Sequence, residues 1–340
     1  MPMRRTGSRR EGRPARSYSS HPGGMLLSEA SSGDPDLPIY RVDNGTVALA
    51  FLPTVGGRLI SVAAHGRELL WRNPEYLDAS LQAVRRRSDW PRHDGTFASW
   101  VNIGGSKTWP APQGWNGEGE WAGPPDPVLD SGAWSIESRE SDDGLVVIMT
   151  SADDPRTGVR ITKEFTVPGS GPEFAQQTTF TNISYQTVTW AVWEVAQIDT
   201  EGGGVHAEVE VDVTDTRVVD LGSYHGTFEV EHGEGTVSAG IQDVVVKRGF
   251  PSASGRIAYY EDTGVGLELS FSPIVDAIYP DQGSRAELWM QAPIPAPLAE
   301  LDGLHPDAWL AELEVLSPLT TMRPGESVSF EIGWRALLAD

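Results

Sequence analysis

The sequence of 340 residues contains no cysteine. This absence excludes disulfide bonds, thiolate nucleophiles and cysteine-ligated metal sites. The sequence also lacks any run of the roughly 18 to 20 apolar residues that a membrane-spanning helix needs. Its arginine-rich start is not followed by the apolar stretch of a signal peptide. We therefore expect a cytoplasmic protein with no membrane partner.

Positive charge is scarce, with 26 Lys and Arg against 48 Asp and Glu, for a formal net charge of −22. Residues 1–35 hold six Arg against three acidic residues, so the remainder sums to −25. An acidic body repels nucleic acid, which we exclude as a partner. We expect residues 1–35 to be a disordered basic tail and residues 36–340 to form a single domain, with Met25 as an alternative first residue.

Helical periodicity is also rare, whereas 37 Gly and 25 Pro indicate many turns. Only residues 74–87 favour a short amphipathic helix, with Leu77, Leu81 and Val84 on one side. Short runs rich in β-branched and aromatic residues recur from residue 37 onward and predict an all-β antiparallel sandwich. The predicted strands are residues 46–52, 58–63, 145–150, 159–167, 173–182, 187–198, 226–230, 256–261, 266–271, 286–291, 311–316 and 327–335.

Tryptophan is concentrated in residues 89–134, where it is embedded in Gly, Pro and Asn rather than in alternating strands. We interpret this segment as a long ordered loop system. Indole faces stack on the C–H face of a pyranose, and Asn102, Trp109 and Gln113 are candidate sugar ligands. The alternative is that the tryptophans only fill the core under a loop.

Residues 188–198 read as one strand with two distinct faces. Alternation places Trp193 and Gln197 together on one face, which offers a ligand an aromatic platform and an amide. Glu194 lies on the opposite, more apolar face, where we expect it to be paired within the core.

Residues 309–316 carry two carboxylates on one face of a strand, because Glu312 and Glu314 alternate with Leu313 and Val315. On an exposed strand this pattern is ordinary solubility patterning. On a concave sheet the same pair points into a cleft, where a carboxylate can accept a proton from a sugar hydroxyl.

Several of these segments together resemble a known family. Residues 55–61 (VGGRLIS), the strand from Asn182 to Trp193, and the Glu314 strand followed by RPGE at 323–326 are similar to the galactose-mutarotase-like, or aldose 1-epimerase-like, superfamily. The GGSKTWPAPQ stretch at 104–113 resembles most closely an uncharacterised bacterial family within it. The resemblance spans about residues 38–337.

This resemblance implies a β-supersandwich with a sugar cleft on a concave sheet. In the mutarotases a Glu deprotonates the anomeric hydroxyl and a His protonates the ring oxygen. The Glu corresponds to Glu314, whereas Trp193 stands on the strand where the His is expected. We expect Lys107 to be a substitute acid, and three loop histidines are further candidates: His93, His225 and His305.

Arg58, Glu312 and the pair Tyr279 and Asp281 complete the predicted sugar-binding residues. No motif for a metal or a cofactor is present, and we expect neither. The expected partner is a small carbohydrate or glycoside; the sequence leaves the oligomeric state open. Two alternatives to an epimerase remain, namely a non-catalytic carbohydrate-binding protein and a lyase-type enzyme acting on a modified sugar or glycosylated natural product.

Overall fold

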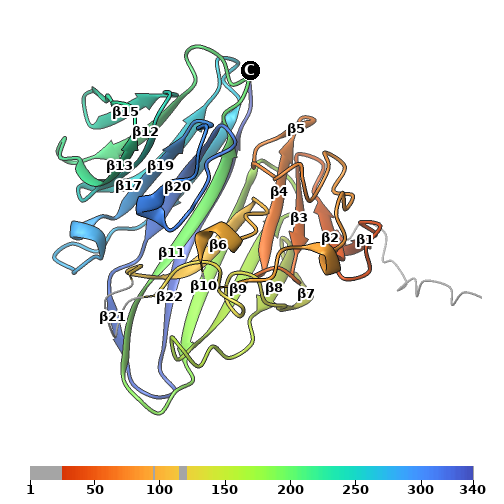
Figure 1. The fold of residues 1–340 in the computed structure, drawn as a ribbon. Helices are drawn as coiled ribbons and strands as arrows, with labels where there is room; N and C mark the ends of the chain where they lie inside the picture. The colour runs from red at the N-terminus through yellow and green to blue at the C-terminus, as the bar shows by residue number, and fades with distance from the viewer. Residues whose placement is uncertain (1–24, 95, 115–120, 340) are drawn as a thin grey trace, which may run out of the picture.

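The computed structural model describes residues 25–94, 96–114 and 121–339. Within this part of the chain, two large antiparallel sheets account for nearly all regular structure (Figure 1). The chain folds this way because its apolar side chains recur at every second position. In β10 (Glu173–Asn182), for example, Phe174, Gln176, Thr178 and Phe180 are buried while the residues between them are not. The predicted all-β class is confirmed.

The larger sheet has twelve strands, and ten of them follow one path across it. In spatial order these are β1 (Ser28–Ala30), β2 (Ile39–Asp43), β3 (Val47–Leu52), β4 (Arg58–Ala64), β6 (Ser106–Ala111), β11 (Val188–Asp199), β20 (Leu310–Leu316), β19 (Ala286–Gln291), β16 (Val245–Phe250) and β13 (Val219–His225). Off this path, β5 (Arg67–Glu68) pairs with β4, and β21 (Thr320–Met322) pairs with β11.

The second sheet has ten strands. In spatial order these are β14 (Glu231–His232), β15 (Thr236–Gly240), β12 (Glu208–Val213), β17 (Ala253–Tyr260), β18 (Gly266–Phe271), β22 (Ser327–Leu337), β10, β9 (Val159–Pro168), β8 (Gly144–Thr150) and β7 (Ser135–Ser141). The described helices are single 3-10 turns, and none is long and apolar enough to cross a membrane: η1 (Arg87–Asp89), η2 (Phe97–Ser99), η3 (Asp281–Gly283) and η4 (Ala299–Leu301).

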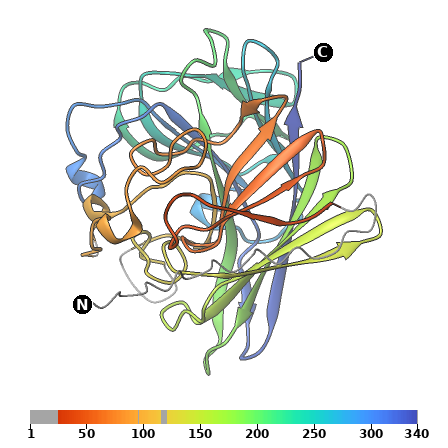
Figure 2. The same ribbon diagram turned by 90° about the vertical axis from the view of Figure 1, so that its right-hand side faces the viewer.

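The two sheets pack face to face around a shared apolar core. Figure 2 gives a second view of the fold, turned by 90° from that of Figure 1. Phe51 of β3 meets Phe165 of β9 across the interface, with ring centroids 5.1 Å apart. Glu194 of β11 also points into this interface, where its carboxylate accepts hydrogen bonds from Ser106, Thr108 and Gln176. The expected pairing of Glu194 within the core is therefore observed. The opposite face of β11 is left free to build a site.

Four local predictions need correction. Residues 74–87 form turns rather than a helix, because Leu81 has a φ of 64° and Leu77 bridges to Ala83. Residues 226–230 follow β13 instead of forming a strand. The predicted loop system at 89–134 contains β6 as a central strand. The predicted tail is described from Met25 onward, and β1 within it pairs with β2; residues 1–24 lie outside the described part of the chain.

Candidate functional site

A cavity of about 580 Å³ opens on the face of the larger sheet that is turned away from the second sheet. Its floor is a row of directly paired residues on four neighbouring strands: Gln197 of β11, Glu312 of β20, Trp289 of β19 and Lys247 of β16. Loops cover the floor and close the walls. They contribute residues within 71–76, 97–102, 113–114 and 301–307 and also Asp281, and β13 adds Leu221 and Tyr224.

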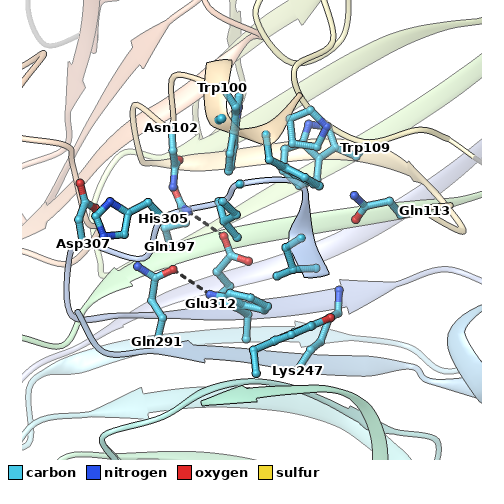
Figure 3. Close-up of a pocket in the computed structure, with 18 of the residues that line it drawn as sticks. Trp100, Asn102, Trp109, Gln113, Gln197, Lys247, Gln291, His305, Asp307 and Glu312 are labelled. Atoms are coloured by element: carbon cyan, nitrogen blue, oxygen red, sulfur yellow. Dashed lines mark hydrogen bonds between the residues drawn. The ribbon is translucent and has the colours of Figure 1, made fainter. Parts of the chain in front are cut away.

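Glu312 lies at the centre of this floor (Figure 3). Its Oε1 accepts a hydrogen bond of 2.7 Å from the Gln197 amide and one of 3.0 Å from the Lys107 ammonium. Oε2 accepts no hydrogen bond from any described residue, and the side chain keeps 14% of its exposure. One carboxylate oxygen is thus fixed by the protein while the other is available to a ligand.

Lys107 lies beneath the cavity rather than on its surface, with only 1% of its side chain exposed. Its ammonium sits between the rings of Trp100 and Trp109, at 5.0 and 4.8 Å from their centroids. Burial lowers the pKa of Lys107, and the neighbouring Glu312 carboxylate opposes that effect. The predicted acid therefore contacts the predicted carboxylate directly, but it does not line the cavity.

Glu314 occupies the neighbouring row of the same sheet face, where it pairs with Glu287 of β19, and neither side chain is exposed. Its Oε2 accepts a hydrogen bond of 2.5 Å from the Trp193 indole and one of 3.0 Å from Lys247. Lys247 also lies 2.8 Å from Glu287 and 4.2 Å above the Trp193 ring. Trp193 and Lys247 line the cavity, whereas the glutamate predicted as the base lies under them.

This second row holds more negative than positive charge. Burial raises the pKa of Glu314 and raises that of Glu287 well above its ordinary range. Burial also raises the pKa of Asp281, which lines the cavity close by. Burial alone would lower the pKa of Lys247, but Glu287 and Glu314 outweigh it and raise that pKa. Three carboxyl groups therefore share one ammonium.

Aromatic rings form one wall of the cavity. Trp109 lies at its centre, with the ring of Trp121 at 4.9 Å, that of Trp193 at 5.4 Å and that of Trp100 at 6.1 Å. The indole N–H of Trp109 is buried and has no hydrogen-bond partner among the described residues. On the floor, the ring of Trp289 lies 5.9 Å from that of Tyr224. The cavity thus offers apolar ring surfaces to a ligand.

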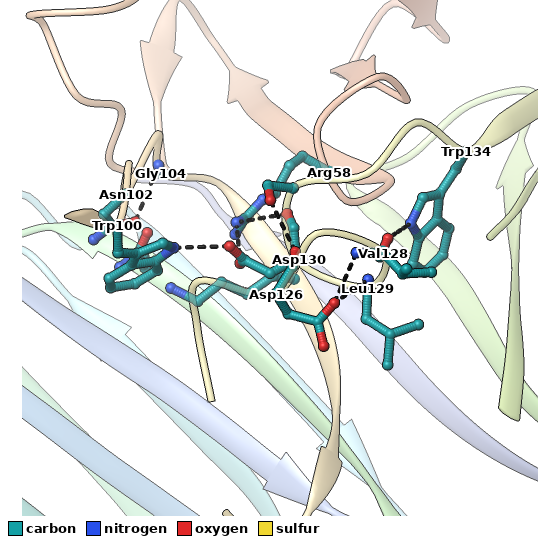
Figure 4. A network of polar contacts seen from close by, with 12 residues as sticks. Arg58, Trp100, Asn102, Gly104, Asp126, Val128, Leu129, Asp130 and Trp134 are labelled. Carbon is teal, nitrogen blue, oxygen red and sulfur yellow. Dashed lines mark hydrogen bonds and ion pairs between the residues drawn. The ribbon is translucent and has the colours of Figure 1, made fainter. Parts of the chain in front are cut away.

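Arg58 lies outside the cavity, in a buried network behind it (Figure 4). Its guanidinium forms a 2.6 Å ion pair with Asp130, and the other oxygen of Asp130 accepts a 2.8 Å hydrogen bond from the Trp100 indole. Because Trp100 lines the cavity, Arg58 acts on the site through this chain of contacts. It holds a wall in place and does not reach a ligand.

Of the remaining predicted residues, some line the cavity and one does not. Asn102, Gln113 and Asp281 line the cavity. Tyr279 does not, because it is buried with its hydroxyl accepting a 2.8 Å hydrogen bond from the Ile274 amide.

Only one of the three loop histidines reaches the cavity. His305 lines it, and its Nε2 lies 2.9 Å from the Ile294 carbonyl. A carbonyl can only accept, so Nε2 carries a proton and Nδ1 remains for exchange. His93 is bonded to the Ser99 carbonyl, and His225 is exposed on β13.

Sequence reasoning missed several lining residues: Lys247, Trp289, Gln291 and Asp307. Lys247 belongs to β16, where a lysine and an arginine interrupt the apolar pattern that marks a strand. Trp289 and Gln291 lie within a correctly predicted strand and alternate there with buried Leu288. The alternation of side chains along this strand could have identified Trp289 and Gln291 as residues of one sheet face.

Comparison with known proteins places the fold. A family model described as a domain of unknown function (DUF4380) matches residues 39–337. A galactose mutarotase-like protein from Clostridium acetobutylicum superimposes with a TM-score of 0.55 at 10% identity, over 92% of this chain and 98% of that one. Another galactose mutarotase-like protein, from Lactobacillus casei, gives 0.51 at 11% identity, over 88% and 99%.

A third solved structure is longer than this chain. It is a TPR-domain containing protein from Parabacteroides distasonis, with a TM-score of 0.56 at 12% identity, covering 92% of this chain but 53% of that one. No curated protein sequence matches the chain. At these identities the likeness concerns the fold, which is that of the galactose mutarotase-like sandwich.

Proposed function

The chain belongs to the DUF4380 family, and we propose that this member binds a carbohydrate in the cavity and interconverts its anomers by acid–base chemistry. Glu312 is the proposed base and His305 the proposed acid. The observation that carries the proposal is the state of Glu312, a carboxylate with one oxygen fixed by Gln197 and Lys107 and the other open to the cavity.

The cavity suits a pyranose in size and in chemistry. Its volume of about 580 Å³ lies within the ordinary range for small-molecule sites. Trp109 and Trp289 present ring faces to the C–H face of a sugar, and Asn102, Gln113 and Gln291 present amides to its hydroxyl groups.

The proposed reaction needs two proton transfers. Glu312 takes the proton of the anomeric hydroxyl while His305 donates one to the ring oxygen, and the bond between the anomeric carbon and the ring oxygen breaks. Rotation of the resulting aldehyde, followed by the reverse transfers, closes the ring as the other anomer. The Lys107 ammonium lies 3.0 Å from Oε1 of Glu312 and holds the carboxylate in place.

In the mutarotases the proton donor is a histidine on the strand where this chain has Trp193. We assign that role to His305. An indole N–H does not exchange its proton in this way, and the Trp193 N–H is already donated to Glu314. In His305 the Nε2 proton is held by Ile294, and the carboxylate of Asp307 interacts electrostatically with the ring. As the proposed acid, His305 donates the Nδ1 proton of its imidazolium form while Nε2 stays bonded to the Ile294 carbonyl. Figure 3 shows His305 and Asp307 together on one side of Glu312.

The assignment moves the base from Glu314 to Glu312. Glu314 is fully buried and engaged by Trp193 and Lys247, so we assign it the role of positioning these two lining residues. In place of the predicted acid, Lys107 becomes the partner that orients the proposed base.

Anomer interconversion followed by NMR tests the proposal directly. Freshly dissolved glucose, galactose and mannose should equilibrate faster with the protein than in buffer. Glu312→Gln should lower that acceleration by about a hundredfold or more, the usual effect of losing a general base. Glu331→Gln, an exposed glutamate of β22 on the other sheet, is the matched control and should leave the rate unchanged. A wild-type rate equal to the buffer background refutes the catalytic proposal.

A second candidate is a carbohydrate-binding protein without catalysis. The observation that favours it is Trp193, an aromatic platform on the strand where the mutarotases carry their histidine. Titration of the intrinsic tryptophan fluorescence with the same sugars separates the two. Saturable binding without anomer exchange supports the binding protein, and exchange above background excludes it.

A further inference from the structure

The charges that surround the cavity do not balance. Four carboxylates line it, on Glu75, Asp281, Asp307 and Glu312, against one lysine, Lys247. Behind this lining stand two further carboxyl groups and the Lys107 ammonium. Glu75 is paired with Arg85 at 3.1 Å, and His305 acts on Asp307, so the remaining four acidic groups face two lysines. The net charge of the whole protein is −22.

The deficit of positive charge is sharpest beside Asp281. Lys247 is the positive group that acts on this carboxyl, yet its ammonium already lies 2.8 Å from Glu287 and 3.0 Å from Glu314. Oε2 of Glu287 is the atom beside Lys247, and Oε1 of Glu314 is buried without a hydrogen-bond partner among the described residues. One ammonium thus serves three carboxyl groups, and Asp281, which lines the cavity, is the one that a second cation can reach.

The rings beside these carboxyl groups already bind ammonium groups of the protein itself. Lys247 lies 4.2 Å above Trp193, and Lys107 lies between Trp100 and Trp109. Electron-rich indole faces next to carboxylates attract organic cations. Among the described residues no three or more His, Asp or Glu side chains are arranged to hold a metal ion. The missing cation is therefore better supplied by a ligand ammonium group.

We infer that the cavity selects an amino sugar, with the ligand ammonium bound beside Asp281 against Trp193 and Trp289. This inference rests on the proposed function, since it names the class of carbohydrate that the same site takes. The sugar ring lies over Glu312, and its amine extends toward the Lys247 end of the floor. Sugars that carry a carboxylate or a phosphate are excluded, because they add negative charge where it is already in excess.

Binding should be linked to proton release. Burial raises the pKa of Asp281, and a bound ammonium lowers it again by favouring the ionised form. Ligand binding therefore releases to the buffer the proton that this carboxyl group carries in the free protein. Neutral sugars bring no charge and should release none.

Isothermal titration calorimetry with matched sugars tests the inference. The probes are glucosamine, galactosamine and mannosamine, each paired with its parent hexose and its N-acetyl derivative, together with glucuronate. At about pH 6, where a primary amine of this kind is protonated, at least one amino sugar should bind about tenfold tighter than both neutral partners. Its binding enthalpy should change with the ionisation enthalpy of the buffer, and that of the neutral partners should not.

Two variants locate the subsite. Asp281→Asn should reduce the preference for the amine to about threefold or less, measured as the ratio of the affinities of the same variant for the amino sugar and for its parent hexose. Asn tolerates the positive φ of 49° at this position. Asp276→Asn is the matched control, because Asp276 is also an aspartate at positive φ, with φ 62°, but it is exposed and does not line the cavity.

The outcomes are distinct. Equal affinity for amine and hexose, tighter binding of glucuronate, or an amine preference that survives Asp281→Asn overturns the inference and leaves the proposed function standing. If no probe binds to the wild-type protein, the proposed function fails and the inference fails with it.

Discussion

Lys163 offers the sharpest test of the electrostatic reasoning, because it is a lysine with no partner inside the core. Its side chain is fully buried on β9, and Nζ has no hydrogen-bond partner among the described residues. Two ring faces, those of Trp134 and Phe165, lie 5.3 and 5.8 Å from the ammonium. Burial lowers the pKa of Lys163 from 10.5 to about 8, against the opposing charge of Glu194.

A lowered lysine pKa means that folding disfavours the charged form. A pKa lower by 2.5, from 10.5 to about 8, corresponds to about 3 kcal/mol of stability lost. That cost is fully present below the folded pKa of about 8. The cost decreases as the pH rises from about 8 to 10.5. In this range the unfolded chain still binds a proton that the folded chain has released. Lys163→Met, which keeps the length of the side chain and removes the charge, should therefore stabilise the protein at about pH 7.

Urea unfolding of wild type and variant, followed by circular dichroism, measures this effect. The variant should gain up to about 3 kcal/mol at about pH 7, and the gain should shrink steadily between about pH 8 and pH 10.5. Arg160→Met, on the exposed face of the same strand, is the control and should give a small difference independent of pH. A Lys163→Met protein that is less stable at neutral pH, or whose gain does not vary with pH, refutes the assigned environment of Lys163.

Two further substitutions test the packing that supports the site. Arg58→Met should cost about 3 to 5 kcal/mol in urea unfolding, because it leaves the buried Asp130 carboxylate without its partner; a loss below about 1 kcal/mol contradicts the buried pair. Gly57→Ala should cost at least about 1 kcal/mol, since a Cβ there would lie 2.3 Å from the Trp134 ring at a φ of +55°. An unchanged midpoint in thermal unfolding would contradict that close approach.

Strands with unbroken alternation were predictable to the residue. The predicted ranges 173–182, 266–271 and 286–291 match β10, β18 and β19 at both ends. β18 and β19 place apolar side chains at every second position, and β10 alternates in the same way with Phe174, Gln176, Thr178 and Phe180 buried. In all three strands the local pattern agrees with the tertiary packing.

The pattern failed where tertiary contacts override it. β6 contains a proline and is preceded by two glycines, which signal a loop, yet it lies between β4 and β11 in the sheet. Gly104 and Gly105 are needed there because a Cβ at either position would lie within 2.6 Å of backbone atoms of Trp71 or Leu59. The leucines of residues 74–87 are likewise apolar without being helical: Leu77 and Leu81 are buried in a separate small cluster under the site.

The pair Glu312 and Glu314 shows the limit of alternation most clearly. Period two correctly places both carboxylates on the sheet face that carries the cavity, together with Trp193 and Gln197. It gives no information about position along the strand, and two residues correspond to roughly 6.6 Å. This displacement along the strand separates the two environments. Glu312 is paired with Gln197 and faces the cavity, whereas Glu314 lies under Trp193 and Lys247.

The choice between the two glutamates depends on Lys247 and Trp289, whose strands lie across the sheet from β11. Lys247 pairs with Trp289, which pairs with Glu312, so this row forms the cavity floor and the row of Glu314 and Glu287 falls beneath its side chains. Register between strands far apart in sequence is fixed by the folded sheet, and single-strand patterns do not contain it. Glu312 is therefore the proposed base, because the register of the sheet leaves its carboxylate at the cavity and that of Glu314 beneath it.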